Sequence, residues 1–412
     1  MSDDNKNNPF SADADPELNY ASYSLDEMLE AYESIDKKVF PDRAEALRKL
    51  ILERQPSISS INHSDEKIIA SSRVKFHGSG TEFFAIWIVN ILLSIVTLGI
   101  YSAWATVRTN RYFYSNTEIV GHRLAYLAQP MQILKGRIIA VLLLAIYLIT
   151  SHFSPQAGVV VILLIALLTP FIICMSVRFR MRMMSYRNVR FNFKMRYGRA
   201  FVVFFLFPIL GLISLYLAMP WVIKKIDEFL HEGMEYGNKD FKPELSAGEY
   251  YIAVILSGVI GVVGFIAIAI TMGVGFSMGS LENESWSVGK ILPFGIAAIM
   301  YFLIIVVTSA FYKAHIRNHL YNSTRIKDVA AFKSDVKFLS LAGLYATNYL
   351  MLIFSLGLAY PWVKVRTSRF FADSTNVTVF AGIEDVVADS GSQDSAVADE
   401  VVGAFDIDLS LG

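Results

Sequence analysis

Three stretches of this chain place a tryptophan about one helical turn before two basic residues. These basic corners are Trp104 with Arg108 and Arg111, Trp221 with Lys224 and Lys225, and Trp362 with Arg366 and Arg369. Arginine presents a forked set of donors that matches phosphate, which suits the corners to anionic lipid headgroups. The alternative is that they only anchor the chain at the membrane interface. We predict that Arg108 and Arg366 bind lipid phosphate or a buried acidic partner.

Other polar residues give weaker indications of chemistry. Asn90 and Asn348 occupy similar depths in two related segments, where they would line a polar path or form an interhelical hydrogen bond. His315 and His319 have a spacing that suits zinc, but no carboxylate lies between them in the usual arrangement. The sequence has no nucleophile elbow, phosphate loop or dinucleotide motif. We therefore expect a non-enzymatic protein without a metal or cofactor.

The elements that carry these residues are long apolar segments. Apolar residues make up 54% of the chain and charged residues 18%, and the charges lie between the apolar runs. A spanning helix needs about 20 residues, and seven runs approach that length: roughly 83–103, 138–153, 157–177, 200–222, 250–276, 291–312 and 338–363. This pattern predicts an all-α, multi-pass membrane protein. The net charge of zero gives no indication of a nucleic-acid partner.

Four of these runs, the second, third, fifth and sixth, contain no Asp, Glu, Lys or Arg. Proton- and sodium-driven carriers nearly always bury ionisable groups in the membrane. The sequence therefore argues against an ion-coupled carrier, while an uncharged solute stays open as a substrate.

An internal threefold repeat connects the other three runs. The first and seventh share Leu-Gly at 98–99 and 356–357, followed by their basic corners in the same register, and the fourth is a weaker copy. We place the repeats near residues 76–117, 191–241 and 332–375. A second recurrence, near 111–117, 186–188 and 321–324, precedes alternating stretches such as 124–126 and 190–193. These stretches predict short β segments in cytoplasmic loops.

The basic loops argue for an unusual topology. Lys and Arg mark cytoplasmic loops, and residues 104–137, 178–199, 223–249 and 312–337 hold five, eight, four and six of them. Seven alternating crossings cannot place all four loops on one side. Four crossings plus three re-entrant or interfacial hairpins can, with the bend of the fourth segment at Pro208 and Gly211. Seven ordinary helices with one misplaced basic loop stay as the alternative.

The two ends of the chain are polar. Residues 1–72 predict a cytoplasmic acidic segment with a helical hairpin at about 24–54 and a linker, and this hairpin is a candidate site for a protein partner. The membrane domain covers 73–375. The acidic tail, 376–412, ends in an apolar and acidic stretch from Phe405 to Leu409, which we expect to pack against the basic cytoplasmic face.

The chain resembles the YjgN-like family of bacterial inner-membrane proteins, a domain of unknown function. The residues that carry the resemblance are 76–84, 97–104, 111–114 and the tail at 403–408. The resemblance implies a multi-pass protein of the bacterial inner membrane, with both termini expected in the cytoplasm, and it implies no activity. We predict a protein that handles lipid or an uncharged solute, with anionic headgroups as partners. The alternative is a membrane-anchored assembly protein that acts through its cytoplasmic termini.

Overall fold

The structure is a computed structural model that describes residues 67–279 and 288–386, together with scattered positions between 31 and 48. The chain divides into two compact units, Met1–Glu66 and Lys67–Gly412. Most described positions of the first unit are helical, and Ala31, Ala44 and Leu47 are buried. The rest of the hairpin expected at 24–54 lies outside the described residues, as does the expected docking segment of the tail.

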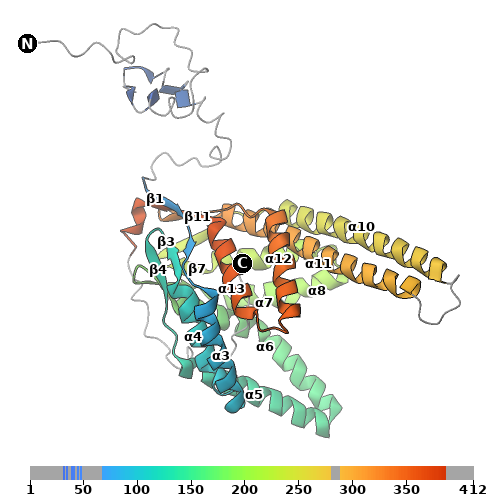
Figure 1. Cartoon of the computed structure of the whole chain (residues 1–412). Helices are drawn as coiled ribbons and strands as arrows, with labels where there is room; N and C mark the ends of the chain where they lie inside the picture. The colour runs from blue at the N-terminus through green and yellow to red at the C-terminus, as the bar shows by residue number, and fades with distance from the viewer. Residues whose placement is uncertain are drawn as a thin grey trace, which may run out of the picture. The chain divides into compact units, whose positions relative to one another are not determined.

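Four long helices form two antiparallel pairs in the second unit (Figure 1). They are α5 (Pro130–Phe153), α6 (Pro155–Arg182), α10 (Ala247–Gly279) and α11 (Val288–Asn322). Ser154 ends α5 and caps α6, where its side chain accepts a hydrogen bond from the amide of Ala157. By length and composition these are the four described helices that can cross a membrane. Most of their large apolar side chains are exposed, so lipid is the environment that would cover them.

Three shorter hairpins each join an apolar helix to an amphipathic one. They comprise α3 (Gly80–Val96) with α4 (Ser102–Ser115); α7 (Tyr197–Phe201), η2 (Val202–Leu206) and α8 (Phe207–Ile213) with α9 (Met219–Glu232); and α12 (Phe338–Phe354) with α13 (Tyr360–Asp373). These hairpins correspond to the three predicted repeats.

The same turn closes all three short hairpins. Leu98, Leu215 and Leu356 each have a φ of 50° or 51°, and the next residue is also left-handed. In each copy the amide of that next residue bonds the carbonyl five positions earlier, for example Gly357 to Leu352 at 2.8 Å. The residue before each of these leucines carries a side-chain hydroxyl, for example Ser355. This hydroxyl accepts a hydrogen bond from a backbone amide at the start of the return helix.

The bend predicted at Pro208 and Gly211 is wrong. Helical backbone continues through both residues, and the turn comes later, at Leu215. Pro208 follows a π-helical turn, which accommodates the missing proline N–H without breaking the helix. At Gly211 an added Cβ would lie 2.7 Å from the sulfur of Met219, so the return helix packs closely on the helix at this point.

Eleven short strands connect the helices in one antiparallel sheet. They are β1 (Ile68–Arg73), β2 (Lys75–Phe76), β3 (Thr117–Ile119), β4 (His122–Tyr126), β5 (Met184–Tyr186), β6 (Val189–Phe193), β7 (Met234–Tyr236), β8 (Lys239–Pro243), β9 (Thr324–Ile326), β10 (Ala330–Ser334) and β11 (Thr375–Phe380). The order is β1-β11-β10-β9-β8-β7-β6-β5-β4-β3-β2. Because only Val74 separates β1 from β2, the two edges of the sheet are continuous in the chain and the sheet closes into a ring.

The sheet corrects the expectation of an all-α protein with short β segments. The segments predicted at 124–126 and 190–193 are strands, but they belong to one shared sheet rather than to separate loops. Strands of two to six residues have too few backbone hydrogen bonds to be stable alone. Each pair of strands also bonds to the neighbouring pair, so the backbone groups at the strand edges find hydrogen-bond partners.

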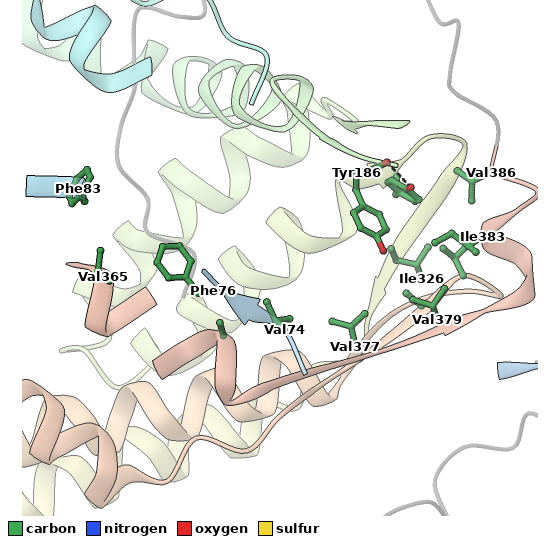
Figure 2. Close-up of a cluster of buried hydrophobic side chains, with 14 residues drawn as sticks. Val74, Phe76, Phe83, Tyr186, Ile326, Val365, Val377, Val379, Ile383 and Val386 are labelled. Carbon is green, nitrogen blue, oxygen red and sulfur yellow. Dashed lines mark hydrogen bonds between the residues drawn. The ribbon is translucent and has the colours of Figure 1, made fainter. Parts of the chain in front are cut away.

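The inward side chains of the strands form one hydrophobic core, which includes Val74, Phe76, Ile326, Val377 and Val379 (Figure 2). Two tyrosines tie neighbouring strand hairpins together inside it. Tyr236 donates from its hydroxyl to the carbonyl of Tyr186 at 3.0 Å, and Tyr186 donates to the carbonyl of Ile119 at 2.9 Å. Burial raises the pKa of Tyr236 to about 12, so its hydroxyl keeps its proton and the bond persists at neutral pH.

Candidate functional site

Two of the basic corners are hydrogen-bonded to Asn90 and Asn348. Arg108 donates from Nη1 to Asn90 Oδ1 at 3.4 Å and to the hydroxyl of Tyr101 at 3.1 Å. Arg366 donates from Nη1 to Asn348 Oδ1 at 3.0 Å and from Nη2 to Thr347 Oγ1 at 3.1 Å. In both hairpins the pair connects the apolar helix to its return helix across 18 positions of sequence. In each pair the buried asparagine gains an arginine as its hydrogen-bond donor.

The middle copy lacks this pair and uses an acidic residue instead. Phe207 stands where the other copies have asparagine, and its ring packs on Trp221 at 4.7 Å. Lys224 and Lys225 both donate to Glu228, at 2.7 and 2.8 Å. Burial alone would raise the pKa of Glu228, but the two lysines lower it below its ordinary value.

Of the remaining corner residues, Trp362 and Arg369 of the last hairpin contact residues in or next to the first hairpin. Trp362 packs on Phe84 of α3, with ring centroids 5.0 Å apart. Arg369 donates to the carbonyl of Gly78 at 2.8 Å. Trp104 stacks on Tyr101, and Arg111 is exposed. The structure therefore places the nine predicted residues in three separate copies, and it links Asn90 and Asn348 to arginines that the sequence analysis treated separately.

A cleft of about 900 Å³ lies between the first short hairpin and the base of α5 and α6. Its lining combines hydroxyl and amide groups with three cationic side chains, and no Asp or Glu is among the described lining residues: Trp87, Asn90, Ile91, Ser94, Ile95, Ser102, Ala105, Thr106, Thr109, Asn110, Tyr114, Tyr126, Arg137, Phe179, Arg180, Met181, Met184 and Lys364. We call this the cationic cleft. Of the predicted site residues, it includes Asn90.

Each cation of the cleft comes from a different helix. Arg137 of α5 donates to Ser102 Oγ and, at 2.8 Å, to Thr106 Oγ1, which fixes it against the return helix α4. Lys364 of α13 lies 4.9 Å above the ring of Phe113. Arg180 is on the last turns of α6. Arg137 and Arg180 are 43 positions apart on consecutive helices, and Lys364 lies far from both in sequence, so no local motif could have revealed the site.

The cleft adjoins a smaller apolar cavity of about 210 Å³, and Met181 and Met184 line both. Phe191, Phe241 and Phe332 of the strands line this second cavity. The two spaces therefore share a wall formed by Met181 and Met184.

A second group of titratable side chains lies where α9 packs against α10 and α11. Tyr250 is fully buried and donates to Asp227 Oδ2 at 2.7 Å, and the ring of His231 lies 2.7 Å from the Asp227 carbonyl. Burial raises the pKa of Asp227 above its ordinary value, although Tyr250 and His231 oppose the shift. Burial also lowers the pKa of His231. Sequence reasoning missed this group, because no spacing rule connects Tyr250 to Asp227, 23 positions earlier.

The histidines considered for zinc belong to the edge of this group. His315 contacts Glu249 Oε2 at 2.8 Å, and His319 Nε2 accepts the amide of Ser246 at 3.0 Å. The described residues bring no three metal-ligating side chains together. The carboxylate near His315 thus comes from a neighbouring helix and forms an ion-pair contact with one histidine.

Asp227→Asn is expected to raise the melting temperature at pH 7.5 by about 2–4 °C. With a raised native pKa, the folded state holds the proton more tightly than the unfolded chain, so wild-type stability falls as pH rises through that pKa. Asparagine keeps the acceptor for Tyr250 and removes this charge. The difference between the two proteins should shrink as the pH is lowered toward the ordinary pKa of aspartate, and comparison at each pH largely cancels the titration of His231 and Glu228. Equal effects of Glu244→Gln, an exposed control, would contradict the prediction.

The long apolar helices identify the class of protein to which this chain belongs. Among the described residues, four apolar helices long enough to cross a membrane, together with exposed apolar surfaces, make this a multi-pass membrane protein. The chain belongs to the family described as "Bacterial protein of unknown function (DUF898)", whose model matches residues 71–404.

Curated relatives confirm the YjgN-like resemblance. The chain is 25% identical over 359 residues to the inner membrane protein YjgN of Escherichia coli O157:H7 and to that of strain K12, covering 76% of this chain and 89% of each relative. It is 25% identical over 354 residues to the Salmonella typhimurium protein of the same name, covering 73% and 87%. No solved structure matches the chain significantly. The names of the relatives support an inner-membrane location.

Proposed function

We propose that this protein binds anionic lipid, with the phosphate headgroup in the cationic cleft and the acyl chains against the apolar helices beside it. The observation that carries the proposal is the described lining of the cleft, which brings Arg137, Arg180 and Lys364 together with hydroxyl groups and includes no Asp or Glu among the residues that the structure describes. Ile91 and Ile95 of α3 continue this lining toward the exposed apolar end of the hairpin.

The proposal includes a topology in which α5, α6, α10 and α11 cross the membrane and the three short hairpins enter it and return. All five helix pairs begin and end at the sheet, which supports an even number of crossings between successive strands. The basic loops lie beside that sheet, so the sheet and both termini are cytoplasmic by the charge rule. The cleft then opens near the cytoplasmic headgroups.

The basic corners have a secondary role in this proposal. Arg108 and Arg366 hold the two arms of their hairpins together through Asn90 and Asn348. The assembly role proposed for the cytoplasmic termini stays a prediction, because most of residues 1–66 and 387–412 lie outside the described part of the chain.

Arg180→Gln with Lys364→Gln is expected to weaken binding of phosphatidylglycerol about thirtyfold. Each basic side chain near an anionic lipid contributes about 1 kcal/mol, so two contribute about 2 kcal/mol. Binding would be measured by native mass spectrometry of the purified protein titrated with phosphatidylglycerol, with phosphatidylcholine as the neutral lipid. The matched control is Arg190→Gln with Lys242→Gln, two exposed strand residues outside the cleft. Equal losses in both variants would show that only net charge matters, and the proposed site would be wrong.

A further inference from the structure

The end of the chain has the composition of a ligand for the cationic cleft. Residues 387–412 contain six acidic residues and no Lys or Arg. Near the end, Phe405, Ile407 and Leu409 alternate with Asp406 and Asp408. In an extended segment, alternating side chains point to opposite sides, so one side would be apolar and the other acidic.

We propose that the segment Phe405–Leu409 docks in the cationic cleft of the same molecule and competes there with anionic lipid. The competition rests on the proposed function, whereas the docking does not. For Asp406 and Asp408, the described lining of the cleft provides three cationic side chains and contains no Asp or Glu. For the apolar side chains it provides Ile91, Ile95, Phe179 and Met181. The segment thus matches both kinds of surface that the lining provides.

The length of the connecting chain permits this docking. Val386, the last described residue, packs in the hydrophobic core inside the sheet. Phe191, Phe241 and Phe332 pack against the same core and line the apolar cavity that adjoins the cleft. The 18 residues from 387 to 404 span about 23 Å on average as a flexible chain and up to about 60 Å when extended.

Attachment to the same chain makes even a weak contact effective. A connection of 18 residues keeps the segment near the cleft, and short linkers give effective concentrations in the millimolar range. A lipid has to displace it, so the tail would set a threshold for the amount of anionic lipid that the protein binds. Removing its two charges should lower that threshold.

A disulfide trap tests the docking. In a Cys174→Ser background, which removes the single cysteine of the chain, Thr109→Cys places a thiol in the cleft and Ile407→Cys places one in the segment. Under mild oxidation in nanodiscs, we expect an intramolecular cross-link that forms at least tenfold faster than in the control with Thr109→Cys and Ser392→Cys. Equal rates, or cross-links between molecules only, would overturn the docking.

Lipid binding tests the competition separately. Asp406→Asn with Asp408→Asn should raise the affinity for phosphatidylglycerol about tenfold, whereas Asp394→Asn with Asp399→Asn, the same charge change outside the segment, should not. Unchanged affinity in the first variant would overturn the competition. If the cross-link forms but the wild-type protein binds no phosphatidylglycerol, the docking stands and the lipid function fails. If lipid binds and no cross-link forms, the lipid function stands and the docking is wrong.

Discussion

Aspartate in place of Leu356 is expected to abolish most of the correctly folded protein in the membrane. Leu356 forms the turn between α12 and α13, and its side chain is 93% exposed. Leu98 and Leu215, at the turns of the other two short hairpins, are 95% and 83% exposed. If the hairpins enter the bilayer, lipid covers these leucines, and a carboxylate at the same place costs about 3 kcal/mol. The loss is a large fraction of the stability of most proteins.

The measurement is the amount of monodisperse protein extracted from membranes, together with its melting temperature in nanodiscs. Leu98→Asp should have the same effect as Leu356→Asp. The matched control is Ile68→Asp in β1, where the side chain is 60% exposed at the sheet, outside the proposed membrane region. A Leu356→Asp protein as abundant and stable as the Ile68→Asp protein would show that the turns lie in water, and the re-entrant topology would be wrong.

Gly80→Ala should lower the free energy of unfolding by about 1–3 kcal/mol, the usual cost of overpacking. Gly80 begins α3, and an added Cβ would lie 2.3 Å from Cδ1 of Trp362 on α13. The indole cannot easily move away, because Phe84 packs on it with ring centroids 5.0 Å apart. The substitution therefore separates the first hairpin from the last, near the point where β1 and β2 close the sheet.

Two variants make this result specific to the contact. Gly343→Ala in α12 meets no atom within 4 Å, so it should be neutral or slightly stabilising, as alanine usually is in a helix. Gly80→Ala combined with Trp362→Leu should be less destabilised than the sum of the two single changes, because the smaller side chain leaves room for the methyl group. Additive effects in chemical unfolding would mean that Gly80 and Trp362 do not limit the packing.

Several features of the protein could be predicted because they are local. The length of an apolar run decides whether a helix can cross a membrane, so α5, α6, α10 and α11 were recognisable. The repeated Leu-Gly and basic corners identified two short hairpins, and the third was found as a weaker copy. The position of the turn in the third hairpin was not predicted correctly. Proline and glycine break a helix only where the surrounding backbone cannot accommodate them, and here helical backbone continues through both residues.

The cleft and the titratable group around Asp227 could not be predicted, since each collects side chains from helices that only the fold brings together. Arg137, Arg180 and Lys364 share a cleft although more than 180 positions separate the last two. Without a known motif, sequence patterns do not show that residues so far apart in the chain lie close together in space.

The sequence alone determined that the chain is a membrane protein with repeated helical segments, because hydropathy and spacing are properties of neighbouring residues. Only the tertiary structure decided that the loops between those segments form a single closed sheet. A strand of three residues has no recognisable periodicity, and its partner can lie far away: Ile68 pairs with Phe380. That closure places the ends of all five helix pairs around one core and creates the cationic cleft beside it, because backbone hydrogen bonds between distant segments, rather than local propensity, set their relative positions.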